Sequence, residues 1–299
     1  MSDFAGKLKE FSVDFNKKLP DLFVFAKGRE RQVAEAMFYS LSNGGKRLRP
    51  FLVMKSAALF GVSAEKSFVV AAALECLHTY SLIHDDLPAM DNDDLRRGMP
   101  TCHKKFDEAT AILAGDGLLT MAFELLCGDK NTFEANKKCL LAEKLAKGAG
   151  AFSGMVAGQM LDLDTEKSAN ADNPEELIKH IEEMKTGCLL KFACEAGAIM
   201  GDAGIDEYNA LLSYARKIGI AFQITDDILD VEGDEMQMGK TLGKDVLQDK
   251  LTFVSLYGLD KAKQIAAQLI DDAKKSLNVF GDKAKDLQDL ADFILNRRN

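Results

Sequence analysis

Apolar residues recur along most of the chain at the three- and four-residue spacing of amphipathic α-helices. Convincing alternation of apolar and polar residues, which marks half-buried strands, is absent from the sequence. The pattern therefore predicts an all-α fold. Helices are expected at residues 29–42, 50–60, 64–86, 108–127, 132–149, 150–162, 174–201, 205–232, 249–258, 260–280 and 283–297.

The expected helix at 64–86 differs from the others because it is apolar on nearly every side. Such a helix is buried all round, so we expect it at the centre of a helical bundle. Asn173, Pro174 and the two acids that follow them are typical of a helix start. The loops expected to matter for function are 87–107, 163–173 and 233–248.

The composition limits the classes of function. The chain has 299 residues, of which 47% are hydrophobic, and no low-complexity tract, linker or repeat divides it. We therefore predict one large domain, 1–299, with a sizeable core. The formal net charge of -9 argues against a nucleic-acid binder and against a protein that binds anionic membranes. An acidic protein that binds a polyanion needs local basic clusters, metal ions or both.

Targeting and membrane segments are not evident. The N-terminus lacks a signal-peptide core, and the longest apolar run, 68–83, is interrupted by Glu75 and His78 and is short for a membrane span. We expect a cytoplasmic protein without stable membrane insertion. The cysteines form no C-x-x-C pair and no zinc spacing, so most are expected to be buried reduced thiols. They are Cys76, Cys102, Cys127, Cys139, Cys188 and Cys194.

Two clusters of aspartates each end an apolar helical stretch. They are Asp85, Asp86 and Asp91 in the first cluster, and Asp226, Asp227 and Asp230 in the second. Asp226 and Asp230 lie four residues apart, within about 40° of each other on a helix face. Their charges repel, and burying them without a partner costs several kcal/mol. A divalent cation removes the conflict, and Mg²⁺ prefers carboxylate oxygens that it shares with water and phosphates. A solvated acidic helix end is the alternative for either cluster alone.

Basic residues gather near these acids. Lys46 and Arg49 follow Gly44-Gly45, a pair typical of a helix end that also lets backbone N–H groups approach a ligand. Arginine suits bidentate contact with phosphate and lysine supplies a point charge, although a basic turn at a helix end is the alternative. Further cations follow the first cluster or flank the second: Arg96, Arg97, Lys185, Lys240 and Lys250.

His78 precedes Asp85 by seven residues, which is two helical turns, so both side chains point to one side of the same helix. A lone histidine in such a helix is more often a core residue, but its alignment with the aspartates favours function. Carboxylates and cations thus form two walls that can hold two diphosphates, one through Mg²⁺ and one directly. The sequence contains no P-loop, no Rossmann glycine fingerprint and no nucleophile elbow.

Five motifs occur in the order found in all-trans isoprenyl diphosphate synthases. They are Gly44-Gly45-Lys46-Arg47-Leu48-Arg49-Pro50, Asp85-Asp86-Leu87-Pro88-Ala89-Met90-Asp91, Arg96-Arg97-Gly98, Lys185-Thr186-Gly187 and Phe222-Gln223 through Asp230. The chain resembles this family over residues 40–258, and within it most resembles the bacterial farnesyl diphosphate synthases. The resemblance implies a bundle of about ten main helices around a deep central cavity, usually as a homodimer.

The resemblance also implies substrates and cofactors. Both aspartate clusters would bind Mg²⁺, with three ions in the substrate complex and Mn²⁺ as an alternative, against an allylic diphosphate such as dimethylallyl or geranyl diphosphate. Direct ligands of that diphosphate would be Arg96, Lys185, Lys240 and Lys250. The metal-free pocket for isopentenyl diphosphate would comprise Gly45, Lys46, Arg49, His78 and Arg97, and Phe222 would also bind substrate.

By the same resemblance, Thr186 and Gln223 face the developing allylic cation. Metals withdraw charge from the leaving diphosphate, and preorganised dipoles stabilise the cation. The isopentenyl double bond then attacks, and the lost proton passes to the departing diphosphate, so no protein general base is expected. The expected catalytic residues are Asp85, Asp86, Asp91, Lys185, Thr186, Gln223 and Asp226.

The first aspartate motif also bears on product length. Asp91 lies six residues after Asp85, about 120° off its face in an uninterrupted helix, but Pro88 lacks an N–H and is expected to loosen the turn and return Asp91 to the metal. Tyr80 lies about 140° around the helix from Asp85 and deeper, so its ring can form a floor, while Ser81 leaves room. By resemblance this combination favours a C15 product, with C20 and then C10 as alternatives.

Three other classes remain as alternatives. A class I terpene cyclase usually replaces the second aspartate motif and lacks an isopentenyl pocket, which contradicts this sequence. A non-catalytic subunit of a heteromeric prenyl synthase is expected to lose aspartates, yet all six are present. A helical adaptor with accidental acidic patches explains neither the motifs nor their order.

Overall fold

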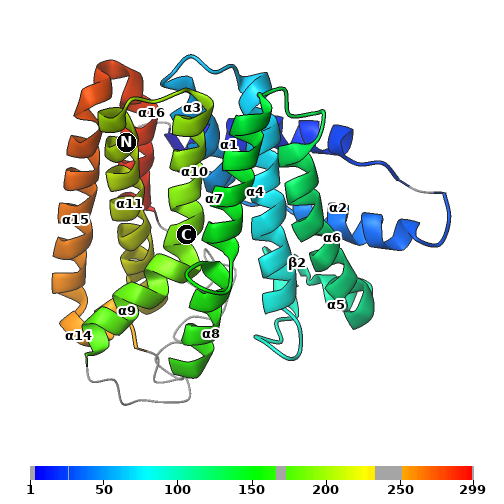
Figure 1. Ribbon diagram of the computed structural model, residues 1–299. Helices are drawn as coiled ribbons and strands as arrows, with labels where there is room; N and C mark the ends of the chain where they lie inside the picture. The colour runs from blue at the N-terminus through cyan, green and yellow to red at the C-terminus, as the bar shows by residue number, and fades with distance from the viewer. Residues whose placement is uncertain (1–3, 26, 166–172, 233–250, 298–299) are drawn as a thin grey trace. The chain divides into compact units, whose positions relative to one another are not determined.

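The computed structural model describes residues 4–25, 27–165, 173–232 and 251–297. The chain forms two compact units, one of residues 1–54 and 63–142 and the other of residues 55–62 and 143–299. The prediction of a single domain stays a prediction. Helices dominate the described residues of both units, which confirms the all-α fold class (Figure 1).

The first unit is built around α4 (Ala64–Asp85), which packs most extensively against α6 (Glu108–Cys127) (Figure 1). Every residue of α4 from Ser67 to Leu77 is buried, so the expected central helix is confirmed. Its other elements are α1 (Phe4–Lys18), η1 (Leu19–Leu22), α2 (Arg31–Ser42), β1 (Leu95–Arg96), β2 (Met99–Pro100) and α5 (Cys102–Lys105). The helices α3 (Leu48–Ala58) and α7 (Ala135–Ala149) carry the chain between the units.

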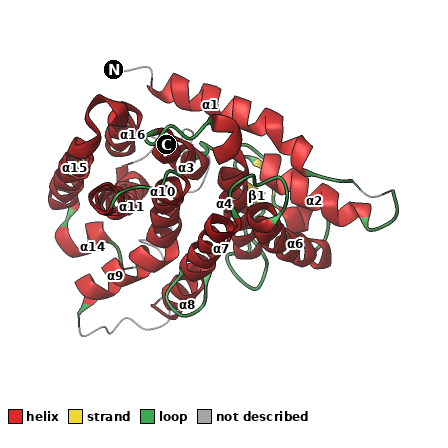
Figure 2. Cartoon of the chain, turned by 45° about the horizontal axis from the view of Figure 1, so that its top comes forward, coloured by secondary structure: helices red, strands yellow, loops and turns green. Residues whose placement is uncertain are grey.

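The second unit is built around α11 (Ile205–Glu232), which packs against α10 (Cys188–Met200), α15 (Leu259–Ser276) and α16 (Lys285–Asn296). Figure 2 shows α15 and α16 beside α11. The remaining elements are α8 (Met155–Thr165), α9 (Pro174–Glu182), η2 (Glu183–Gly187), α14 (Phe253–Tyr257) and η3 (Leu277–Ala284). Asn173 caps α9 by accepting the Glu176 N–H at 3.4 Å, with Pro174 in the first turn, which confirms that predicted start.

Three segments differ from the sequence prediction. The helix α1 was missed, although Phe4, Leu8, Phe11 and Phe15 repeat at helical spacing and all but Phe11 are buried. The range 174–201 is not one helix, because the π-helical turn η2 separates α9 from α10. The loop expected at 87–107 contains the β1–β2 hairpin and α5.

The helix α6 is the one helix in the described ranges that is long and apolar enough to cross a membrane by length and composition. Half of its most apolar window is buried in the structure, where it packs against α2, α4 and α5. Core helices of globular proteins pass the same test, so this finding is weak evidence of a membrane span. The absence of stable membrane insertion and the cytoplasmic location stay predictions.

The cysteines are all free thiols, but only three of them, Cys76, Cys102 and Cys194, are buried. Burial raises the pKa of the Cys76 and Cys194 thiols, which keeps both in the neutral form. Cys127 and Cys139 are exposed, so the expectation that most cysteines are buried was wrong. Both lie on helix faces that their unit leaves open to solvent.

Candidate active site

The first aspartate motif lies where α4 ends. The helix stops at Asp85, before Pro88, because proline disfavours helical conformation at the residue before it and cannot donate a backbone hydrogen bond. The chain then folds back, and the Asp91 N–H donates to the Asp85 carbonyl at 2.8 Å while Asn92 donates to the Leu87 carbonyl at 3.1 Å. The backbone of Asp91 thus returns to that of Asp85, as the position of Pro88 predicted.

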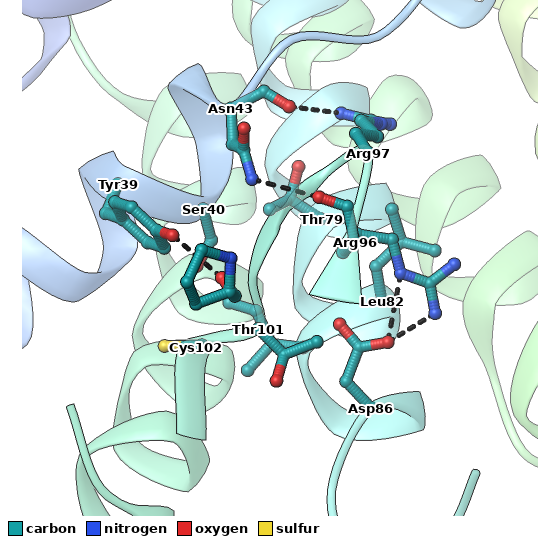
Figure 3. Close-up of a pocket in the computed structure, with 12 residues that line it drawn as sticks. Tyr39, Ser40, Asn43, Thr79, Leu82, Asp86, Arg96, Arg97, Thr101 and Cys102 are labelled. Carbon is teal, nitrogen blue, oxygen red and sulfur yellow. Dashed lines mark hydrogen bonds and ion pairs between the residues drawn. The ribbon is translucent and has the colours of Figure 1, made fainter. Parts of the chain in front are cut away.

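Asp86 is buried and is held by an arginine that the sequence assigned to a substrate. The Arg96 Nε donates to Asp86 Oδ1 at 2.9 Å, and Arg96 Nη2 donates to the same oxygen (Figure 3). Burial raises the pKa of the Asp86 carboxyl, and the Arg96 guanidinium opposes that rise. In this structure Asp86, which was expected to bind the metal, and Arg96, which was expected to bind the diphosphate, therefore bind each other.

Arg97 occupies the tip of the β1–β2 hairpin. Arg96 pairs with Met99, and the two residues between them, Arg97 and Gly98, have φ of 55° and 77°, the type I′ geometry that favours Asn and Gly. The conformation turns the Arg97 side chain to the loop after α2, where Nη1 donates to the carbonyls of Asn43 at 3.2 Å and Gly44 at 2.7 Å (Figure 3).

Gly45 makes this contact possible. Its φ is +101°, and a Cβ there would lie 2.6 Å from Arg97 Cζ. A side chain at position 45 would therefore both strain the backbone and displace the Arg97 guanidinium. The expected role of Gly45 in substrate binding thus has a structural counterpart, because it admits Arg97 to the cationic cluster.

His78 and Arg49 form the centre of the same cluster. Arg49 Nη1 lies 3.2 Å from His78 Nε2, and because a guanidinium only donates, Nε2 is the acceptor and the imidazole is neutral with its proton on Nδ1. Burial and then the charges of Arg49, Arg97, Arg47 and Arg96 lower the pKa of His78 well below its ordinary value. Such an accumulation of positive charge attracts anions.

A pH dependence of stability follows from this lowered pKa. Below pH about 6.5 the unfolded chain protonates His78 while the folded protein does not, so protons favour unfolding. Replacing His78 by Gln should therefore flatten the loss of unfolding free energy on acidification, by at most about 1.4 kcal/mol per pH unit. Urea unfolding of both proteins at pH 7.5 and 5.5 measures the difference, and parallel losses would contradict the lowered pKa.

Arg47, to which the sequence gave no role, fixes the chain between Lys46, in the loop before α3, and Arg49, in the first turn of α3. Its buried guanidinium contacts Glu75 Oε1 at 2.5 Å, and it also donates to the Leu41 carbonyl at 2.5 Å and to Asn16 Oδ1 at 2.9 Å. Glu75, inside the apolar run at 68–83, was the sequence signal that could have revealed the role of Arg47, since a buried glutamate requires a cationic partner.

A small cavity opens among these elements of the first unit (Figure 3). Its volume is about 20 Å³, which suits one water molecule and not a diphosphate. Its lining includes Tyr39, Asn43, Thr79, Asp86, Arg96 and Arg97. The cavity lies beside the Asp86–Arg96 pair, and both residues line it.

Tyr80 and Ser81 lie on α4, in the turn before the first aspartate motif. Tyr80 is buried, and its ring packs edge-on against His84 with centroids 5.7 Å apart. Burial raises the pKa of the Tyr80 hydroxyl, and the Asp85 charge raises it further, so the ring stays neutral. The Ser81 hydroxyl donates to the His78 carbonyl at 2.9 Å. Their role in product length stays a prediction.

The second aspartate motif lies on the unbroken helix α11, and each carboxylate has a different environment. Asp226 Oδ1 accepts from Arg297 Nη2 at 2.7 Å. Asp227 Oδ2 accepts from the Phe253 N–H at 2.8 Å, at the start of α14. Asp230 is buried, and its Oδ2 has no hydrogen-bond partner among the described residues.

Lys185 and Thr186 lie in the π-helical turn η2, which α8 contacts closely. A Cβ on Gly158 of α8 would lie 2.3 Å from the Lys185 nitrogen, so only glycine allows this approach. Lys185 Nζ forms an ion pair of 2.5 Å with Asp162 of α8, which is a partner that the sequence reasoning missed. Single π-helical turns occur often at functional sites because they re-aim side chains.

Of the other expected residues, three are described by the structure and two are not. Gln223 is half-buried on α11, and the Phe222 ring lies 3.9 Å beneath the Arg297 guanidinium. Lys46 is half-buried in the loop before α3. Lys240 and Lys250 lie outside the described residues.

Comparison with known proteins assigns the chain to a family. The sequence profile described as Polyprenyl synthetase matches residues 30–290. The chain belongs to the polyprenyl synthetase family. This membership confirms the recognition of an all-trans isoprenyl diphosphate synthase and the prediction of a prenyltransferase.

Individual relatives match over nearly the whole chain. The sequence is 44% identical to farnesyl diphosphate synthase of Escherichia coli, over 99% of each chain, and 42% identical to geranylgeranyl diphosphate synthase of Cyanophora paradoxa, over 95% of this chain and 92% of that one. Among solved structures, the apo FPP/GFPP synthase of Zymomonas mobilis superposes with a TM-score of 0.88 at 41% identity, covering 98% of this chain and 99% of that one.

The family implies a metal, and the donors fit a hard divalent cation. Among the described residues no three of His, Cys, Asp and Glu converge closely enough to hold an ion by themselves. Mg²⁺ does not need such a cage, because it keeps waters and takes one or two carboxylates together with substrate phosphates. The buried Asp230 oxygen without a hydrogen-bond partner is costly unless a cation or water reaches it. All-oxygen donor sets favour Mg²⁺ or Mn²⁺.

Proposed function

We propose that the protein condenses isopentenyl diphosphate with dimethylallyl and then geranyl diphosphate to form farnesyl diphosphate. The observation that carries the proposal is the separation of charge around α4. Its C-terminal end presents Asp85, Asp86 and Asp91, whereas the charges that act on His78 are those of arginines. Relatives named farnesyl diphosphate synthase support the C15 product, including that of Bacillus subtilis at 42% identity over 98% of this chain.

Bound at the aspartates, Mg²⁺ supplies positive charge that stabilises the leaving diphosphate. Asp85, Asp86 and Asp91 would hold such ions at the first motif, and Asp226, Asp227 and Asp230 would hold them at the second, with three ions expected in all. Arg96 and Lys185, which now contact Asp86 and Asp162, exchange those carboxylates for the phosphate oxygens. Because each cation keeps an anionic partner throughout, binding costs less than desolvating a free charge would.

The isopentenyl diphosphate binds without metal at Lys46, Arg49, His78 and Arg97. The neutral His78 accepts a hydrogen bond from Arg49 and so fixes the direction of that guanidinium. Oxygens of Thr186 and Gln223 stabilise the allylic cation, and the departing diphosphate takes the proton released after C–C bond formation.

The deciding experiment is a product analysis. The protein is incubated with Mg²⁺, isopentenyl diphosphate and each allylic starter, and the chain length of the product is determined by chromatography. A C15 product from both dimethylallyl and geranyl diphosphate is expected. Accumulation of C20 or C10 would assign the alternative product lengths instead. Release of diphosphate without elongation would contradict the proposal and indicate a cyclase.

The basic cluster makes a separate prediction. Lys46→Ala and Arg97→Ala should raise the KM for isopentenyl diphosphate at least about tenfold and leave the KM for geranyl diphosphate nearly unchanged, because each removes a direct charge contact to one substrate only. Steady-state kinetics with each substrate varied in turn measures this. Lys104→Ala, which removes an exposed ion pair with Asp94, is the control. Weaker binding of the allylic substrate alone would contradict the division of roles.

The family resemblance implies a homodimer, and α6 offers a surface for one. Ile112 and Leu113 are large apolar residues of this apolar helix, and they are 45% and 53% exposed. Light scattering during size-exclusion chromatography should therefore give about twice the chain mass of 32.7 kDa. Leu113→Glu should shift the protein toward the monomer, and a dimer that resists this change must use another face.

A further inference from the structure

The residue that follows α16 reaches the second aspartate motif on α11. Arg297 directly follows α16, and its side chain is only 5% exposed. Arg297 Nη2 donates to Asp226 Oδ1 at 2.7 Å and to the Phe222 carbonyl at 2.8 Å, and the guanidinium lies over the Phe222 ring at 3.9 Å. A residue near the chain terminus is thus fixed on α11 by three contacts.

The guanidinium depends on the Asp226 charge. Its Nε is buried and has no hydrogen-bond partner in the part of the chain that the structure describes. Burial lowers the pKa of Arg297, and the Asp226 carboxylate is the charge that offsets this cost. Withdrawing that carboxylate would leave this buried cation, within the described ranges, with the Phe222 carbonyl and ring face as its contacts, which is unfavourable.

Asp226 has 38% of its side chain exposed, whereas Asp230 is buried. An ion that binds Asp226 through its carboxylate would lie within a few ångströms of the Arg297 guanidinium. Two cations at that separation repel, and the repulsion is strong where the guanidinium is buried. Arg297 in this position and a metal ion on Asp226 therefore oppose each other.

We propose that Arg297 competes with the metal ion for Asp226, so that this guanidinium lowers the metal affinity of the second motif and is displaced when the ion binds. The inference rests on the proposed function, which assigns Asp226 to the metal. It makes Arg297 a positioning residue that acts through Asp226, and it needs no contact between Arg297 and substrate.

Metal binding without turnover tests this competition. Mn²⁺ is titrated into the protein without substrate, and the free ion is measured by electron paramagnetic resonance. Arg297→Gln should bind Mn²⁺ about tenfold more tightly at one class of site, within the usual range for coupled sites. Arg297→Lys keeps the charge but loses the second hydrogen bond, so its affinity for Mn²⁺ should lie between those of the unaltered protein and Arg297→Gln. It serves as the readout if Arg297→Gln does not fold.

Two controls separate competition from loss of structure. Lys274→Gln breaks the 2.8 Å ion pair with Asp292 that joins α15 to α16, and it should leave Mn²⁺ binding unchanged. In an Asp226→Asn background, Arg297→Gln should have no further effect, because the shared oxygen no longer carries charge. An effect that persists in that background would overturn the proposal.

The opposite results are equally informative. Weaker Mn²⁺ binding by Arg297→Gln would mean that Arg297 orients Asp226 for the ion, and unchanged binding would mean that it only docks α16. Either result overturns the competition. Failure of the unaltered protein to form any prenyl diphosphate would instead reject the proposed function, so the two failures are distinguishable.

Discussion

Asp85→Asn and Asp226→Asn should each lower turnover by about three decades at saturating Mg²⁺, which corresponds to about 4 kcal/mol in the barrier. Each change removes a negative charge where the proposed metal stabilises the leaving diphosphate, and the ion loses an anionic ligand. Asparagine is preferred to alanine at position 226 because its carbonyl still accepts the Arg297 hydrogen bond, so that the C-terminal contact survives.

The measurement is single-turnover elongation of geranyl diphosphate with saturating isopentenyl diphosphate, which separates chemistry from product release. Asp14→Asn, on the exposed face of α1 where Asp14 pairs with Lys17, is the matched control and should keep normal rates. Circular dichroism checks that each variant is folded. Near-normal turnover in either motif variant would reject the metal role of that aspartate.

The helices were predictable where one face or the whole surface of a helix is apolar without interruption. The bounds expected for α6 and α11 agree with the structure at both ends, and α4 ends within one residue of its expected limit. Repeating apolar contacts along a helix determine its length locally, so the sequence contains that information. The π-helical turn η2 could not be predicted, because the close approach of α8 at Gly158 depends on packing between distant segments.

The sequence identified charged residues of the candidate site but not the ion pairs that they form. Arg96 contacts Asp86 across 10 residues of sequence, Lys185 contacts Asp162 across 23, and Arg297 contacts Asp226 across 71. The sequence analysis assigned Asp86 and Asp226 to metal ions and Arg96 and Lys185 to a diphosphate, since ligand preference was the only guide. It gave Asp162 and Arg297 no role. In the folded protein the nearest opposite charge is in the chain itself, and fold topology alone brings these pairs together.

These pairings indicate how binding proceeds. A diphosphate that takes Arg96 from Asp86 also releases a buried carboxylate, whose charge then favours a cation. If Arg96 binds the diphosphate and Asp86 the metal, as proposed, binding of the anion and binding of the metal should support each other at the end of α4. The same exchange at Lys185 and Asp162 would leave an acid on α8, which the sequence reasoning did not assign to any ligand.

Replacing Tyr80 should change what the enzyme makes more than how fast it works. Tyr80 is 7% exposed and its ring packs edge-on against His84, on the helix that ends in the first aspartate motif. If the ring forms the floor under the growing chain, Tyr80→Ala removes most of a phenol ring and admits further five-carbon units. The expected products are C20 or longer, at the expense of C15.

Two variants make this test specific. Tyr80→Phe keeps the ring and should still stop at C15, whereas Ser81→Phe adds bulk in the same turn and should shift products toward C10. Loss of a buried ring costs about 3–5 kcal/mol of stability and overpacking about 1–3 kcal/mol, so the ratio of product lengths is a better readout than the rate. A Tyr80→Ala protein that folds, turns over and still releases only C15 would show that another residue limits the chain.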